Sequence, residues 1–225
     1  LRGSQHDEEH RIRLKLRDAF TPSQPVANIH QFAGRTDTLR HLIRALEDQR
    51  LHVVLYGERG MGKTSLLRVL MQLAGQAQYI VRYISCGETS NFSDTFRVVA
   101  ADIPLLYHDD YDPTTAETES GKTLDALLPD GPLGSNQISD LFAKLSGTRV
   151  LVVLDEFDRS PDGAFRRSVA ELIKSLSDRS IRVQLVIAGV AGNLAELVEH
   201  IPSIRRNVLG LRVPNMTLAE IREMI

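Results

Sequence analysis

Apolar residues along this chain follow two alternating patterns. Short, nearly continuous apolar runs are typical of strands buried on both faces of a parallel sheet. They predict strands at 52–56, 79–85, 149–154, 183–189 and 207–213. Between them, apolar residues recur every three or four positions, which predicts helices at 62–75, 93–101, 137–145, 163–177 and 194–200. An earlier helix, capped by Thr36 or Asp37, runs through Leu46. Strands that alternate with helices predict an α/β fold with a parallel sheet.

Three stretches stand apart from this alternation. Residues 1–25 are charged and then broken by prolines, so we interpret them as an N-terminal arm or a cloning remnant. The core spans 26–215, and a further helix begins at 216–225. Within the core, 102–135 is interpreted as an acidic insertion, because 102–130 carries eight acidic residues against one lysine. Long loops of this kind are usually functional or disordered. We expect a mobile, protease-sensitive loop with a short helix near 123–128.

Composition narrows the class of protein. Of 225 residues, 42% are hydrophobic and 25% are charged, which predicts a packed core. The net charge of −2 gives no general attraction to nucleic acid or to an anionic membrane. Cys86 is the one cysteine, so an intramolecular disulfide is excluded and a reducing, cytoplasmic location is expected. The sequence contains no apolar run long enough to span a bilayer.

The candidate chemistry begins where the 52–56 strand ends. Gly57, Gly62, Lys63 and Thr64 match the Walker A pattern G-x-x-x-x-G-K-[ST], which lies between a predicted strand and a predicted helix. Such a loop wraps backbone N–H groups around phosphates, its lysine contacts the β- and γ-phosphates, and its hydroxyl binds Mg²⁺. The expected nucleotide-binding residues are Gly57, Glu58, Arg59, Gly60, Met61, Gly62, Lys63, Thr64 and Ser65. The alternative is an ordinary glycine turn.

A second acidic motif follows the 149–154 strand. Asp155 would lie at the carboxyl end of a buried strand and hold Mg²⁺ together with Thr64, as in a Walker B motif. Glu156 would act as the general base that activates a water molecule, with Lys63 as the catalytic cation. The alternative is a solvated acidic turn. An N-K-x-D motif, which reads guanine, is absent from the sequence, so ATP is favoured over GTP.

Taken together, the motifs FAGR, GERGMGKT, VVLDEFD, VIAGVAGNL and PSIRRN resemble the AAA+ branch of P-loop ATPases. The resemblance covers 29–225 and is strongest to archaeal-type, origin-recognition ATPases, which grade into STAND NTPases. It implies an ASCE-type P-loop NTPase fold, a three-layer sandwich with a five-stranded parallel sheet. The fourth strand should lie between the Walker A and Walker B strands. It also implies that 26–215 is the nucleotide-binding core and that a lid domain, begun at 216–225, is largely absent.

The resemblance assigns roles to further residues. Phe32 and Gly34 would shape the adenine pocket, although a buried phenylalanine at a helix entry explains FAGR equally well. Asn193 would be the sensor of the γ-phosphate, but Gly192 aligns with the family's asparagine. Arg205 and Arg206 would form an arginine finger that acts on a neighbour's ATP in a homo-oligomer; the alternative is a solvated basic helix end. A finger is expected because the core motifs offer no second cation opposite Lys63.

These observations predict an ATP-binding, Mg²⁺-dependent ATPase module that couples nucleotide binding and hydrolysis to conformational change or assembly, with ATP and ADP as its ligands. The alternative is a slow, STAND-like signalling switch with little turnover. A DNA-binding replication initiator is the third reading, but the basic pairs Arg166–Arg167 and Arg205–Arg206 are too sparse to support nucleic-acid binding within this chain.

Overall fold

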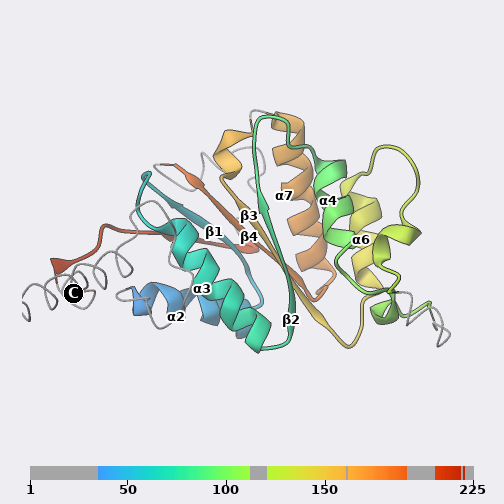
Figure 1. The fold of residues 1–225 in the computed structure, drawn as a ribbon, viewed down its shortest axis with the longest axis horizontal. Coiled ribbons are helices and arrows are strands. Elements are labelled where there is room, and N and C mark those ends of the chain that lie inside the picture. Colours follow the sequence, from blue (N-terminus) through green and yellow to red (C-terminus); the bar gives the residue numbers. More distant parts are fainter. Residues whose placement is uncertain (1–34, 112–120, 161, 192–205, 219, 221–225) are drawn as a thin grey trace, which may run out of the picture.

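The computed structural model describes residues 35–111, 121–160, 162–191, 206–218 and 220. In these residues, five parallel strands form one sheet in the order β2-β3-β4-β1-β5 (Figure 1). The strands are β1 (His52–Gly57), β2 (Tyr79–Ser85), β3 (Arg149–Asp155), β4 (Val183–Val190) and β5 (Val208–Arg212). The fourth strand therefore lies between the strand that enters the phosphate loop and the strand that ends at Asp155, which confirms the predicted topology.

Helices cover both faces of the sheet, so the core is a three-layer α/β/α sandwich (Figure 1). On one face lie α2 (Thr36–Glu47) and α3 (Lys63–Gln76). On the other lie α4 (Phe92–Ala100), α6 (Ser135–Ala143) and α7 (Gly163–Asp178). None of the described helices is long and apolar enough to cross a membrane. The predicted arm at 1–25 and the helix at 194–200 lie outside the described residues.

The two packed layers explain why the central strand β3 is apolar from Val150 to Leu154. Successive side chains of a strand point to opposite faces. In β3, Val150, Val152 and Leu154 pack against α4, α6 and α7, while Leu151 and Val153 pack against α2 and α3. All five of these side chains are at most 1% exposed. Alternation of polar and apolar residues is therefore lost, and a continuous apolar run remains.

The start of α2 differs from the prediction. The N-cap is Arg35, in a left-handed conformation with φ 55°, and no side chain caps the helix. Thr36 and Asp37 lie inside the first turn, where Asp37 forms an ion pair with Arg40 at 2.7 Å. The predicted caps were wrong because the helix begins one residue earlier, at an Arg35 whose backbone N–H donates to Glu220 Oε1 at 2.8 Å.

The acidic segment is packed in both of its described parts, 102–111 and 121–135. Ile103 and Leu124 are fully buried, and the Leu124 N–H donates to the Ile103 carbonyl oxygen at 2.9 Å. Short 3-10 helices form at η2 (Leu105–Tyr107) and η3 (Leu124–Leu127). The expectation of a mobile loop is wrong for these residues, because apolar side chains spaced among the acids join the core. The short helix predicted near 123–128 is confirmed, and 112–120 lie outside the described residues.

Candidate functional site

The predicted phosphate loop connects β1 to α3 at the carboxyl edge of the sheet. Gly57 has φ 151°, and a Cβ there would lie 2.9 Å from the Val213 carbonyl oxygen, so a side chain would collide with backbone. Gly62, the N-cap of α3, is left-handed with φ 71°. The apolar β1 and the amphipathic α3 pack into the core, and the glycines let the chain reverse between them. The first backbone N–H groups of α3 therefore lie next to the loop.

Lys63, the first residue of α3, lies folded back over the loop. Its Nζ donates to the carbonyl oxygens of Gly57 at 2.9 Å and Glu58 at 2.7 Å. Burial lowers the pKa of Lys63, while the carboxylates of Asp158 and Asp155 oppose that shift. The ammonium group lies at the cavity, hydrogen-bonded to two neutral carbonyl oxygens. Phosphate oxygens, which carry negative charge, would bind it more strongly.

Asp155 closes β3 and is 2% exposed. Its Oδ2 accepts hydrogen bonds from Thr64 Oγ1 at 2.8 Å and from the Tyr83 hydroxyl at 3.0 Å, and its Oδ1 accepts from the Glu156 N–H at 2.8 Å. A hydroxyl and a carboxylate oxygen this close are a donor set that fits Mg²⁺, which keeps most of its remaining positions for water and phosphate. The described residues hold no cluster of three or more His, Cys, Asp or Glu that could bind a metal by themselves.

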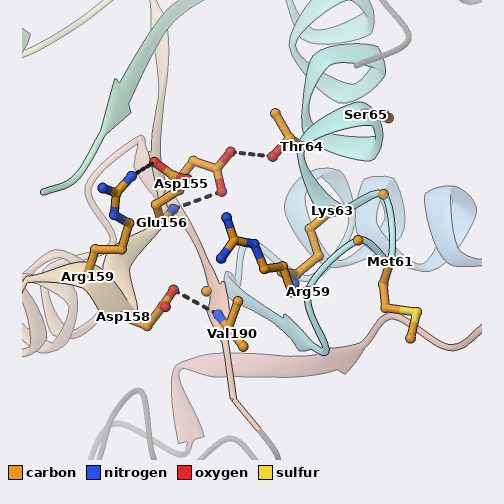
Figure 2. A pocket seen from close by; sticks show the side chains of 13 residues that line it. Arg59, Met61, Lys63, Thr64, Ser65, Asp155, Glu156, Asp158, Arg159 and Val190 are labelled. Atoms are coloured by element: carbon orange, nitrogen blue, oxygen red, sulfur yellow. Dashed lines mark hydrogen bonds and ion pairs between the residues drawn. The ribbon is translucent and has the colours of Figure 1, made fainter. Parts of the chain in front are cut away.

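Glu156 follows in a left-handed conformation, φ 54°, which turns its side chain toward the end of β2. Its Oε2 accepts a hydrogen bond from Ser85 Oγ at 2.9 Å. The same oxygen accepts a hydrogen bond from Arg159 Nη1 at 3.0 Å (Figure 2). The bond from Ser85, followed by that from Arg159, lowers the pKa of Glu156. The carboxylate is ionised and can accept a proton once these donors release it.

These groups line one cavity of about 510 Å³ (Figure 2). Its lining contains most of the residues predicted for phosphates and metal: Arg59, Gly60, Met61, Gly62, Lys63, Thr64, Ser65, Asp155 and Glu156. The structure adds Asp158, Arg159, Gly189 and Val190. Phe32, Gly34, Asn193 and Arg205 lie outside the described residues, and Arg206 is exposed.

The added residues lie at or just after strand ends. The sequence predicted where these strands end but not which side chains from neighbouring strands meet there. Asp158 Oδ1 accepts the Val190 N–H at 2.8 Å, so the turn after β3 is tied to the end of β4. Tyr83 and Ser85 reach the site because β2 lies beside β3, with Ser85 opposite Asp155. Cys86, just past β2, is 2% exposed, and burial raises the pKa of its thiol to about 12, which argues against a nucleophilic role.

Arg35, the last residue of the FAGR motif, lies behind the phosphate loop and is 7% exposed. Its guanidinium donates to the Met61 carbonyl oxygen and, at 3.1 Å, to that of Pro214, while its backbone N–H donates to Glu220 Oε1 at 2.8 Å. The motif was noted in the sequence for Phe32 and Gly34. The arginine is the member that contacts the loop in the described residues.

Comparison with known proteins identifies the family. The model of the AAA ATPase domain matches residues 31–187. The chain is similar to Cdc6p from Pyrobaculum aerophilum, with 19% identity and a TM-score of 0.54 over 87% of this chain and 48% of that one. It is also similar to the Orc1 protein of Aeropyrum pernix, solved in complex with DNA, with 17% identity and a TM-score of 0.53 over 86% of this chain and 48% of that one.

At these identities the solved structures show a shared fold, and the chain spans about half the length of each. A search of curated proteins found no match. The resemblance drawn from the motifs is confirmed by the family model, which covers most of the 225 residues. This chain belongs to the AAA ATPase domain family.

Proposed function

We propose that this chain binds ATP with Mg²⁺ and hydrolyses it, and that the nucleotide cycle drives a change of conformation or assembly. The observation that carries the proposal is the convergence of Lys63, the side-chain oxygens of Thr64 and Asp155, and the Glu156 carboxylate on one cavity of about 510 Å³. Family membership supports nucleotide binding in general terms. The absence of an N-K-x-D motif in the sequence favours ATP over GTP.

Each group would take a distinct part in the reaction. The loop from Gly57 to Ser65 would surround the phosphates with backbone N–H groups, and Lys63 would exchange its two carbonyl partners for phosphate oxygens. Thr64 and Asp155 would hold Mg²⁺, which when bound neutralises charge on the phosphates. Glu156 would leave Ser85 and Arg159 and take a proton from the attacking water.

A slow nucleotide switch is the second candidate, and one observation favours it. The two hydrogen bonds to Glu156 Oε2 lower the pKa of Glu156 and make it a weaker base in this conformation. If the bonds persist with nucleotide bound, turnover will be low and binding alone will carry the signal. The turnover number at saturating ATP separates the two candidates.

The proposal is tested by a pair of substitutions. Lys63→Ala should abolish ATP binding or weaken it severely, because it removes the cation that faces the phosphates. Glu156→Gln should bind ATP like the parent but lose hydrolysis by at least about 100-fold, since an amide cannot accept the proton. Calorimetry measures binding, and phosphate release measures turnover. Lys174→Ala, an exposed lysine on α7, is the matched control and should change neither.

Two outcomes would reject the proposal. A parent chain that binds neither ATP nor ADP in the presence of Mg²⁺ would remove its basis. Parental turnover in Glu156→Gln would show that the base is assigned to the wrong residue. The same assay with double-stranded DNA tests the replication-initiator reading; we expect unchanged turnover, since the net charge of −2 offers no general attraction to phosphates.

A further inference from the structure

A tyrosine on the neighbouring strand reaches the metal-binding carboxylate. Tyr83 lies in β2, opposite Val153 of β3 and two residues before the strand ends at Ser85. Its hydroxyl donates to Asp155 Oδ2 at 3.0 Å, the same oxygen that accepts from Thr64 at 2.8 Å. Oδ2 thus has one donor from α3 and one from β2, and it lies between the two elements.

These donors together define how the Asp155 carboxylate is oriented. Oδ1 is held by the Glu156 N–H at 2.8 Å, and Oδ2 by Thr64 and Tyr83. Thr64 lies in the first turn of α3, directly after the phosphate loop. The Tyr83 anchor is independent of the loop, because it comes from a strand hydrogen-bonded along its length to β3. Partners that orient a metal-binding group commonly contribute to metal affinity.

The Tyr83 hydroxyl is the part of this side chain that reaches Asp155. The residue is 36% exposed, and its hydroxyl donates to Asp155 Oδ2 at 3.0 Å. Deleting the hydroxyl would therefore remove the contact with Asp155 and keep the ring.

We propose that Tyr83 is a positioning residue of the magnesium site, which fixes Asp155 in the orientation that binds Mg²⁺ beside Thr64. The inference rests on the proposed ATP- and Mg²⁺-binding function and assigns a new residue to it. Tyr83 acts through Asp155 and need not touch the nucleotide. Loss of its hydroxyl should therefore weaken Mg²⁺ binding and leave metal-free nucleotide binding unchanged.

The test removes one oxygen atom. Tyr83→Phe keeps the ring on the edge strand and deletes the hydroxyl. Tyr79→Phe is the matched control: it deletes the same atom from the same strand, where the hydroxyl accepts a hydrogen bond from Arg149 at 3.4 Å, away from the cavity. For each protein, binding of a fluorescent ATP analogue is measured in EDTA and across a Mg²⁺ titration. The paramagnetic resonance of Mn²⁺ with ADP then reports metal binding without turnover.

We expect Tyr83→Phe to raise the half-saturating Mg²⁺ and Mn²⁺ concentrations about tenfold, with binding in EDTA unchanged. Tyr79→Phe should match the parent in both. A Tyr83→Phe variant with the parent's metal dependence would overturn the inference, as would an equal loss of binding in EDTA, which would mark a merely structural role. If the parent binds no nucleotide, the proposed function itself fails. If the parent binds nucleotide with Mg²⁺ and Tyr83→Phe matches it, only the role of Tyr83 fails.

Discussion

At the scale of single residues, His52 shows how burial makes the stability of this protein depend on pH. It begins β1, is 3% exposed, and its Nδ1 accepts the Leu185 N–H at 2.9 Å. Burial lowers the pKa of His52 to about 4, below its ordinary value of 6.5. Between pH 6.5 and about pH 4, His52 is protonated in the unfolded chain but remains neutral in the folded chain. The folded state therefore loses stability as the pH falls through this range.

We therefore predict that the free energy of unfolding falls by about 2 kcal/mol from His52 alone between neutral pH and about pH 5. His52→Asn keeps an acceptor near the Nδ1 position and cannot titrate, so its stability should fall less over this window. Urea denaturation at several pH values measures the difference. His41→Asn, on the exposed face of α2, is the control and should follow the parent. Parallel curves for His52→Asn and the parent would contradict the prediction.

Site residues could be predicted where a short sequence motif marks them. Lys63 and Thr64 follow from the spacing of the glycine loop, and Asp155 and Glu156 follow from their place after an apolar strand. Tyr83 and Arg159 were not predicted. Tyr83 reaches Asp155 only because β2 pairs with β3, and Arg159 reaches Glu156 through a single turn of 3-10 helix. Neither feature has a signature in the amino-acid pattern.

At the scale of elements, the hydrophobic pattern predicted the five described strands, because the central strands β1, β3 and β4 are buried on both faces and the edge strands β2 and β5 are partly buried. The same pattern was overlooked in the acidic segment. There Ile103, Leu105 and Leu124 lie in short apolar runs that proline and charged residues interrupt, so no helical or strand period is visible. Their burial depends on the faces of α4 and α6, which charge counting along the chain does not reveal.

The short helix η3 provides a test of that packing. Leu124 is fully buried, whereas Leu127, three residues later, is 42% exposed. Leu124→Ala should lower the free energy of unfolding by about 3 kcal/mol, since it opens a cavity in the core. Leu127→Ala, the matched control, should cost less than about 1 kcal/mol. The midpoint of urea denaturation measures both. Equal small effects would show that the segment contributes little to the folded core.

At the scale of the whole molecule, the cavity holds more positive charge than the motifs indicated. Arg59 and Arg159 line it together with Lys63. The expectation that no second cation lies opposite Lys63 stays a prediction. Arg159 forms an ion pair with Glu156 at 3.0 Å (Figure 2). Arg206 lies exposed just before β5, and Arg205 lies outside the described residues. Two sources of positive charge for hydrolysis can thus be compared: Arg59 and Arg159 of the same chain, and Arg205 or Arg206 of a neighbouring chain.

We predict that full hydrolysis needs a neighbouring chain that donates Arg205 or Arg206. An arginine finger is worth about 10³–10⁵ in rate, so turnover per chain should rise with protein concentration. The decisive test mixes Lys63→Ala, which keeps the arginines, with Arg205→Ala/Arg206→Ala, which keeps its ATP site. Each should be weak alone, and the mixture should recover at least about tenfold. Arg159→Ala mixed with Lys63→Ala is the control, because a residue that acts within its own chain cannot be supplied by a neighbour. Parental turnover of the double arginine variant as a monomer would show that the cations of the cavity itself suffice.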